Sequence, residues 1–220
     1  MIWFLYLIQL SSAANPNPTW AELSHPDNWN YSHSTETQSG TVKVYTKMVD
    51  NFPCFQGLSQ APLDPHLLQE IAADAKSAME WSSADITEAI ELQRTKTYVD
   101  YYQYLDVPMF SDRYWFLRGY FEEDETTVRF RWERLEKGGA HSQKYQQVQK
   151  DFPNAEETPI NIGSWIFTPK DDITIIQYYI CTHPGGNVPT MLQSIATENT
   201  LPNNLNDLIL EGYKRSSTKP

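Results

Sequence analysis

Apolar and charged side chains alternate without a break over residues 128–133, which read VRFRWE. Successive side chains of a β-strand point to opposite faces of a sheet, so this segment is predicted to be a strand with one buried face. A shift of one residue would bury its charged side chains, at a large cost in free energy. Val128, Phe130 and Trp132 are therefore expected to point towards the core.

Similar patterns place strands and helices along most of the chain. Asp64 as an N-cap and Pro65 in the first turn mark one helix, and a long helix is expected from Pro189 to about Tyr213. Residues 138–159 are expected to form a polar loop with a helical turn near Tyr145. Strands are expected at residues 42–47, 55–61, 86–97, 98–106, 113–121, 126–135, 160–168 and 173–183. Strands joined by short hairpins form an antiparallel sheet, so an α+β fold with helices on one face is predicted.

The first 14 residues are predicted to be a signal peptide. Residues 2–10 form an apolar run far shorter than the roughly 20 residues that span a bilayer. The Ser-Ser-Ala-Ala sequence at residues 11–14 supplies the small residues of a cleavage site. Because no Lys or Arg precedes the apolar run, a buried N-terminal helix or strand is the alternative. Residues 15–39 are polar, with a short helix capped by Thr19, and the mature protein is expected to be exported, either periplasmic or secreted.

The balance of charge restricts the partners of this chain. Its formal net charge is −11, and no segment rich in Lys or Arg offsets it. A phosphate backbone would repel such a chain, so nucleic acid is not expected as a partner. Permanent attachment to an anionic membrane is disfavoured for the same reason, whereas transient membrane contact through a small apolar patch is compatible with it.

Four parts of the chain resemble the START family of lipid-transfer domains. Residues 42–47, followed by Phe55-Gln56-Gly57, are similar to the opening strand pair of that family. Glu80-Trp81 resembles the acidic-Trp step before the third strand, and residues 108–113 (PMFSDR) resemble the loop that leads into the central strand. Residues 183–189 (HPGGNVP) resemble the Asp-Pro-Gly-Gly-x-x-Pro turn before the last helix.

The resemblance implies a helix-grip fold, in which a curved antiparallel sheet wraps around a long C-terminal helix. It places a START-like lipid-binding domain at residues 40–215 and implies that a lipid or sterol-like molecule binds in an internal cavity and is carried there. The chain departs from the family pattern at Tyr114, where Asp usually follows Arg113, and at His183, where Asp is frequent. We expect a monomer without a cofactor.

Residues that bind the ligand are expected on the central strands and on the last helix. Alternation does not decide which face of strand 113–121 is inward. Steroid-transporting members of the family place an Arg late on this strand inside the cavity, and the resemblance assigns that position to Arg118, with Asp100 as its partner. A solvent-facing Arg118 is the alternative, and the residues of the last helix are alternatively ordinary core residues. The expected ligand-binding residues are Asp100, Phe116, Arg118, Phe130, Trp132, Met191, Leu192, Ile195, Leu205 and Leu208.

The two cysteines, Cys54 and Cys181, fall on the second and the last predicted strand. In the helix-grip arrangement the first strand is expected to separate these two. Their Cα atoms would then be farther apart than the roughly 7 Å that a disulfide allows. Two free, buried thiols are therefore expected, even though an oxidising compartment would permit pairing.

Two other classes of function remain as alternatives. Some helix-grip relatives are cyclases or hydrolases, but no nucleophile elbow or nucleotide-binding glycine motif is present, and no catalytic residue or metal ligand is expected. The histidines are scattered without metal-ligand spacing: His25, His33, His66, His141 and His183. The third class is a protein-interaction module with a collapsed pocket and a surface built from Tyr98, Tyr101, Tyr102 and Tyr104. Such a module would contain no void large enough for a lipid.

Overall fold

The computed structural model describes residues 18–49, 52–107, 110–137, 139–183, 185–186 and 190–218, without the side chains of residues 190–197 and 218. The predicted signal peptide lies outside these ranges. The helices are α1 (Trp20–Ser24), α2 (Pro65–Ala73), α3 (Ala78–Trp81), α4 (Ser142–Asp151) and α5 (Thr190–Thr218). The strands are β1 (Asn30–Thr37), β2 (Gly40–Val49), β3 (Phe52–Ala61), β4 (Ile86–Arg94), β5 (Tyr98–Leu105), β6 (Arg113–Glu123), β7 (Val128–Arg134), β8 (Glu156–Glu157), β9 (Ile160–Lys170) and β10 (Ile173–His183).

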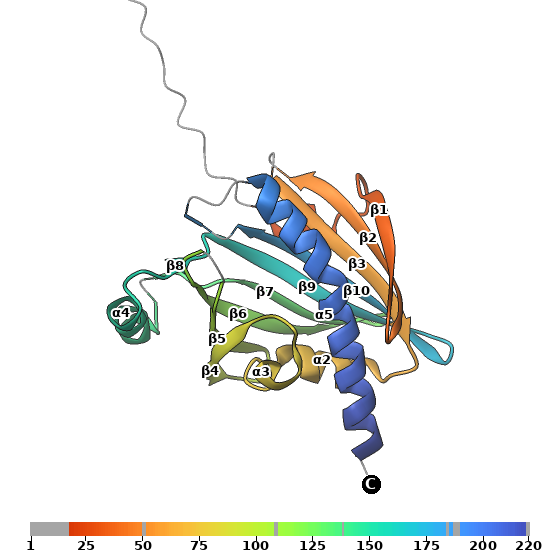
Figure 1. Ribbon diagram of the computed structural model, residues 1–220. Coiled ribbons are helices and arrows are strands. Elements are labelled where there is room, and N and C mark those ends of the chain that lie inside the picture. Colours follow the sequence, from red (N-terminus) through yellow and green to blue (C-terminus); the bar gives the residue numbers. More distant parts are fainter. Residues whose placement is uncertain are drawn as a thin grey trace, which may run out of the picture.

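The described strands form one sheet in the order β1-β2-β3-β10-β9-β7-β6-β5-β4, and the short β8 pairs with β6. All neighbours along this path are antiparallel, and β8 is parallel to β6. Helix α5 crosses one face of the sheet, with α2 and α3 beside it (Figure 1). The predicted α+β helix-grip architecture is confirmed.

The helices begin where the sequence provides caps. The Asp64 side chain accepts a hydrogen bond from the Leu67 amide at 2.8 Å, and Pro65 follows in the first turn of α2. Thr19 and Glu22 form a capping box at the start of α1. Each cap satisfies amide groups that have no partner inside the helix. Both predicted helix starts are confirmed.

Apolar residues are buried on both faces of the sheet. The inner face, towards α2 and α5, carries the largest cluster, which includes Val128, Phe130 and Trp132 as predicted. Two smaller clusters lie on the outer face. One contains Leu23 of α1, and the other contains Tyr145 and Val148 of α4. Helices therefore cover parts of both faces, whereas the sequence predicted helices on one face only.

Helix α4 lies where the sequence predicted a loop with a single helical turn. Most of its residues are polar, and only Tyr145 and Val148 are buried. The Tyr145 ring stacks on Phe116 of β6 with 3.7 Å between the ring centroids. The helix is thus stabilised by packing on the outer face of the sheet and has no long amphipathic pattern. Such packing cannot be recognised from the sequence alone.

Strand β1 occupies part of the segment that was predicted to be polar and without strands. It lies at the edge of the sheet and pairs with β2 from Asn30 opposite Thr46 to Thr37 opposite Gly40. None of its residues is buried. An edge strand is held by its backbone hydrogen bonds and has no apolar face to reveal it in the sequence.

The prediction of two free thiols is wrong, because Cys54 and Cys181 form a disulfide with 4.5 Å between their Cα atoms. Strand β3, which carries Cys54, pairs directly with β10, and Ile180 lies opposite Phe55. Because β1 was not predicted, the strand that carries Cys54 is the third of the sheet rather than the second. No strand lies between it and β10. Both cysteines are fully buried beneath α1.

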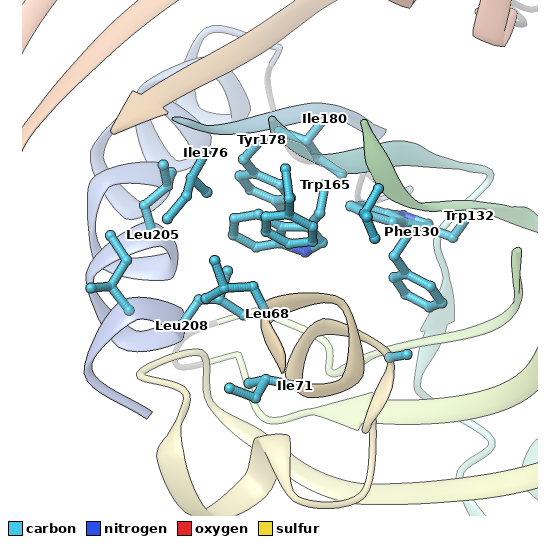
Figure 2. Packing of buried hydrophobic residues seen from close by; sticks show 14 of the residues in the cluster. Leu68, Ile71, Phe130, Trp132, Trp165, Ile176, Tyr178, Ile180, Leu205 and Leu208 are labelled. Carbon is cyan, nitrogen blue, oxygen red and sulfur yellow. The ribbon is translucent and has the colours of Figure 1, made fainter. Parts of the chain in front are cut away.

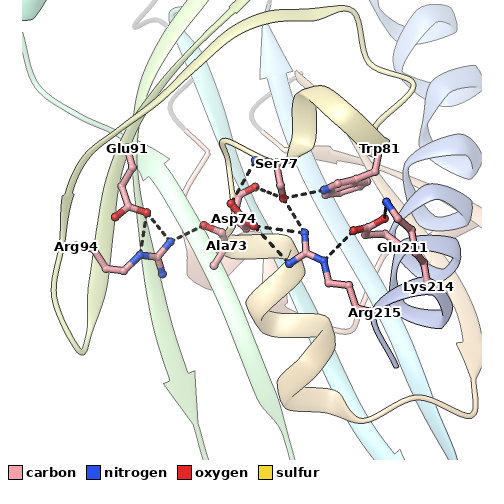
Figure 3. Close-up of polar contacts among 9 residues, drawn as sticks. All are labelled: Ala73, Asp74, Ser77, Trp81, Glu91, Arg94, Glu211, Lys214 and Arg215. Atoms are coloured by element: carbon pink, nitrogen blue, oxygen red, sulfur yellow. Dashed lines mark hydrogen bonds and ion pairs between the residues drawn. The ribbon is translucent and has the colours of Figure 1, made fainter. Parts of the chain in front are cut away.

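Polar contacts connect α5 to the segment between α2 and α3 (Figure 3). The Arg215 guanidinium donates to the Ser77 hydroxyl at 2.7 Å and lies 3.3 Å from an Asp74 oxygen. Glu211 accepts from the Nε atom of Arg215 at 2.8 Å. These contacts hold the end of α5 against the α2–α3 connection. No helix in the described part of the chain is long and apolar enough to cross a membrane.

Candidate functional site

A cavity of about 560 Å³ lies between the inner face of the sheet and the helices α2, α3 and α5. This volume is within the range of roughly 300–1,000 Å³ that is usual for ligand sites. Its walls are mostly apolar, and several of the labelled rings in Figure 2 belong to them. The aromatic residues of the lining are Trp81, Tyr101, Phe110, Trp115, Phe130, Trp132, Trp165 and Tyr178.

Stacked rings form the floor of the cavity. Trp165 of β9 stacks on Tyr178 of β10 with 4.1 Å between the ring centroids, and Trp132 lies 5.8 Å from Tyr178 (Figure 2). The Trp132 indole donates to the Asn161 side-chain oxygen at 2.9 Å. Because these contacts fix the rings and satisfy the indole N–H, the ring faces are left as apolar contact area.

Small residues form the wall on the helical side. Ala72, Ala75 and Ala78 line the cavity from α2, α3 and the turn between them. Trp81 at the end of α3 completes this wall, and its indole N–H donates to the Ser77 hydroxyl at 3.2 Å (Figure 3). Alanines leave space that larger side chains would fill, so the cavity follows directly from the residues of this segment.

One end of the cavity is polar. Arg113, the first residue of β6, lines it and is 5% exposed. Its guanidinium donates to the backbone oxygens of Ser111, Asp112 and Gly185. Burial lowers the pKa of Arg113, and the charges of Glu156 and Asp112 oppose that effect. Arginine nevertheless stays protonated in proteins, so a positive charge lies at this end of the cavity.

Gly185 and Gly186, in the turn after β10, both have positive φ angles, 74° and 62°. Glycine adopts this conformation without strain. A Cβ at Gly185 would come within 3.0 Å of the Glu157 carbonyl oxygen. The turn therefore needs glycine for its shape. The sequence also predicts Asn187 as the cap of the last helix, and this residue lies outside the described residues.

The structure places the predicted site residues in four different settings. Phe130 and Trp132 line the cavity. Leu205 and Leu208 of α5 are fully buried in the inner cluster but are not part of the cavity lining. The side chains of Met191, Leu192 and Ile195 lie outside the described part. Asp100, Phe116 and Arg118 lie on the outer face of the sheet.

The expectation that Arg118 points into the cavity is wrong. Val128, Phe130 and Trp132 point inward, and Gly119 of β6 pairs with Trp132, so the odd-numbered residues of β6 share the inner face. Arg118 instead lines a separate hollow of about 380 Å³ on the outer face. Phe116 packs there beneath Tyr145.

The predicted pairing of Arg118 with Asp100 is confirmed, although on the outer face. The Nε and Nη2 atoms of Arg118 donate to the two carboxylate oxygens of Asp100 at 2.6 and 2.8 Å. His141 Nε2 lies 2.8 Å from Asp100 Oδ2. Burial raises the pKa of Asp100, but the hydrogen bonds from Arg118 and His141 outweigh it, so this pKa is lowered.

Several residues of the cavity were missed, including Arg113, Trp115 and Leu117 of β6. A signal for them was present in the hairpin. Residues 124–127 connect β6 and β7, and Glu123 pairs with Val128. With this four-residue connection, Phe121 lies opposite Phe130 and Gly119 lies opposite Trp132, so both face inward. Because side chains alternate along β6, the other odd-numbered residues, back to Arg113, also face inward. No group of three or more His, Cys, Asp and Glu residues suited to a metal ion occurs within the described part of the chain.

Comparison with known proteins shows similarity at the level of structure. The sequence matches no protein-family model and no curated protein sequence. A STAR-related lipid transfer protein from Xanthomonas axonopodis is 20% identical with a TM-score of 0.66, covering 83% of this chain and 97% of that chain. Human STARD10 is 12% identical with a TM-score of 0.70, covering 93% of this chain and 85% of that chain.

An enzyme shares the same architecture. The Zhui aromatase/cyclase from Streptomyces is 12% identical with a TM-score of 0.51, covering 74% of this chain and 94% of that chain. At these identities the similarity concerns the arrangement of helices and strands, while the chemistry of each site depends on its own residues. The chain therefore has the START-like helix-grip fold.

Proposed function

We propose that this protein binds a lipid or a sterol-like molecule in the cavity beneath α5 and carries it as a monomer without a cofactor. The observation that carries the proposal is the cavity of about 560 Å³, with its mostly apolar, largely aromatic lining. Removing apolar surface from water lowers the free energy by roughly 25 cal/mol per Å², and this favours the binding of an apolar molecule in such a space. The lipid transfer protein with the same fold supports the assignment.

The choice of a carrier over the two alternatives rests on the lining. A protein-interaction module with a collapsed pocket would leave no void of this volume. The side-chain oxygens of Asn161 and Gln103, which are polar groups of the lining, each accept a hydrogen bond from a neighbouring indole, Trp132 and Trp115. Both oxygens hold aromatic rings in place and so help to shape an apolar wall for binding. An enzyme acting on a hydrophobic substrate is the second candidate, since an aromatase/cyclase shares the fold.

Export is part of the proposal. A disulfide between Cys54 and Cys181 is consistent with an oxidising compartment, where such bonds form and persist. The signal peptide predicted at residues 1–14 points in the same direction. We propose a periplasmic or secreted carrier that contacts a membrane transiently when it takes up its ligand.

Native mass spectrometry of the purified protein, followed by organic extraction, tests the proposal. We expect a stoichiometric apolar molecule to be released. The variant Ala72→Trp places an indole in the cavity and is expected to purify empty, whereas Ala21→Trp, on the exposed side of α1, is expected to retain the ligand. A folded protein that purifies empty and takes up no fatty acid, phospholipid or sterol would contradict the proposal.

A second arm of this experiment separates a carrier from an enzyme. The extracted ligand is added back to the protein, and its mass is followed over time. A carrier returns the ligand unchanged. A new mass that forms only with the unheated protein, and that the Ala72→Trp variant does not form, would establish the enzymatic alternative instead.

A further inference from the structure

Arg113 is a buried cation without an ion-pair partner among the described residues. Its exposed fraction is 5%. The oxygens that it contacts, on Ser111, Asp112 and Gly185, are all backbone carbonyls. No carboxylate in the described part lies within ion-pair distance of its guanidinium. A buried charge is costly unless it is paired and hydrogen-bonded, so this arrangement is incomplete as it stands.

Two donors at this end of the cavity lack an acceptor. The Nε atom of Arg113 and the hydroxyl oxygen of Thr158 are buried and have no hydrogen-bond partner in the described structure. Thr158 is only 2% exposed, and both residues line the cavity. A buried donor without an acceptor costs free energy, and such groups are uncommon unless a water, an ion or a ligand completes them.

The backbone explains why these two groups face the same space. Strand β8 runs parallel to β6, with Glu156 opposite Arg113 and Glu157 opposite Tyr114. The Thr158 amide continues this pairing by donating to the Tyr114 carbonyl oxygen at 3.1 Å. Paired residues point to the same side of a sheet and side chains alternate along each strand, so Arg113, Thr158 and the exposed Glu156 lie on the inner side while Tyr114 lies on the outer side.

The positive charge of Arg113 acts on its surroundings. The pKa of His183, at the end of β10, is lowered by burial and by the charge of Arg113. The charges of Glu156 and Asp112 act against the effect of burial on Arg113, and the Asp112 carboxylate is itself bonded to the Tyr104 hydroxyl at 2.6 Å and to the Val107 amide at 3.3 Å. Arg113 is the one cationic residue in the described lining, which also contains Asp85 and Asp106, so an anion in the cavity would be attracted to Arg113 itself.

We propose that Arg113 and Thr158 bind the carboxylate head group of an amphipathic ligand whose apolar chain lies along the aromatic floor of the cavity. This inference rests on the proposed function and names the class of ligand. A carboxylate has two acceptor oxygens, which match the unpaired Nε–H and hydroxyl donors. Hydrogen bonds between charged groups are stronger than neutral ones, so such a head group orients the ligand as well as binding it.

The test compares head groups on one chain length. Laurate, 1-dodecanol, methyl laurate and dodecyl phosphate are titrated at pH 8 against a fluorescent probe bound in the cavity. We expect laurate to bind at least tenfold more tightly than dodecanol and methyl laurate. The variant Arg113→Gln is expected to lose this preference while it still binds dodecanol. The matched control Arg129→Gln, which removes a half-buried cation of the same charge on the outer face of β7, is expected to keep it.

Thr158→Val, which removes only the hydroxyl, is the second variant. It is expected to weaken laurate binding several-fold and to leave dodecanol binding unchanged. If Arg113→Gln fails to fold, this variant alone tests whether the carboxylate binds at this end of the cavity. Equal affinities for laurate and dodecanol in the unmodified protein, or a preference for laurate that Thr158→Val leaves intact, would overturn this inference while the carrier proposal stands. Tighter binding of dodecyl phosphate than of laurate would overturn the carboxylate assignment. If folded protein binds none of the four probes, the proposed function itself fails.

Discussion

The carboxylate of Asp100 is fully buried on the outer face of the sheet, yet its pKa is lowered rather than raised. Burial alone would favour the neutral acid, but Arg118 donates two hydrogen bonds and His141 contacts the same carboxylate. Arg118 in turn lies over the Tyr98 ring, with 4.1 Å from its guanidinium carbon to the ring centroid. These contacts connect β5 and β6 to the loop before α4.

Asp100→Asn is expected to lower the free energy of unfolding by on the order of 2 kcal/mol at pH 7. The loss is less than the roughly 3–5 kcal/mol for a fully buried pair, because the Arg118 side chain is 30% exposed and partly screened. A lowered pKa in the folded state stabilises the protein above the ordinary Asp pKa of about 3.9. That contribution is lost as the pH falls through the lowered value, so the difference between the two proteins should shrink below about pH 4.

Urea denaturation at pH 7 and at pH 3 measures this effect. The control is Asp172→Asn, which removes an exposed carboxylate and should change the stability little at either pH. A difference for Asp100→Asn that is below 0.5 kcal/mol at pH 7, or that grows on acidification, would contradict the assigned role of this group.

At the scale of elements, α5 lies close to the sheet because β3 has a glycine where the helix crosses it. A Cβ at Gly57 would come within 2.4 Å of Leu201 Cδ2 and 2.5 Å of Leu205 Cδ1. Both leucines are almost completely buried. The close approach thus depends on the absence of a side chain at Gly57, and it sets the depth of the space beside α5.

Gly57→Ala is expected to destabilise the protein by about 1–3 kcal/mol, as is usual when a methyl group is forced into a packed core. Leu205→Ala alone should cost about 2–5 kcal/mol through the cavity that it leaves. The double variant should be more stable than the sum of the two losses predicts, because the methyl group fills part of the space that Leu205 leaves. Chemical denaturation of the unmodified protein, the two single variants and the double variant measures the coupling energy between the two positions. Gly139→Ala, where the nearest contact of a Cβ is 3.4 Å, is the matched control. Strict additivity would show that the two positions do not share this space.

At the scale of the whole molecule, the disulfide joins positions 127 residues apart in the sequence. It links β3, near the beginning of the described chain, to β10, the last strand before α5. These two strands are neighbours in the sheet, and the disulfide lies beneath α1 on the outer face. A cross-link over such a long loop restricts the unfolded chain considerably in the loop-entropy model.

Reduction of the disulfide is expected to lower the free energy of unfolding by about 2–4 kcal/mol. Urea denaturation with and without a reductant measures the change, and thiol alkylation with mass analysis confirms the redox state. The double variant Cys54→Ala, Cys181→Ala is expected to resemble the reduced protein and to be insensitive to the reductant. An unmodified protein whose stability does not change on complete reduction would contradict this prediction.

Local sequence patterns were sufficient for most of the individual elements. The caps at Thr19 and Asp64 and the inward face of Val128, Phe130 and Trp132 were predicted correctly, because hydrogen bonding at helix ends and alternation along strands are local properties. The helix-grip architecture was predicted from the order of the elements together with the family resemblance.

The tertiary structure decided which strands are neighbours and which face each one shows to the cavity. The edge strand β1 has no apolar pattern and was missed, and the order of the sheet places β3 directly beside β10, which brings Cys54 to Cys181. Helix α4 covers Phe116 on the outer face, so β6 is apolar on both sides, and only its pairing with β7, not its own alternation, indicates that Arg113 rather than Arg118 lines the cavity. The sequence by itself therefore determined the elements, their caps and the inward side of β7, each of which depends on residues close together in the chain. Strand partners, the disulfide and the charged end of the cavity depend on contacts between distant segments, and only the folded chain brings those together.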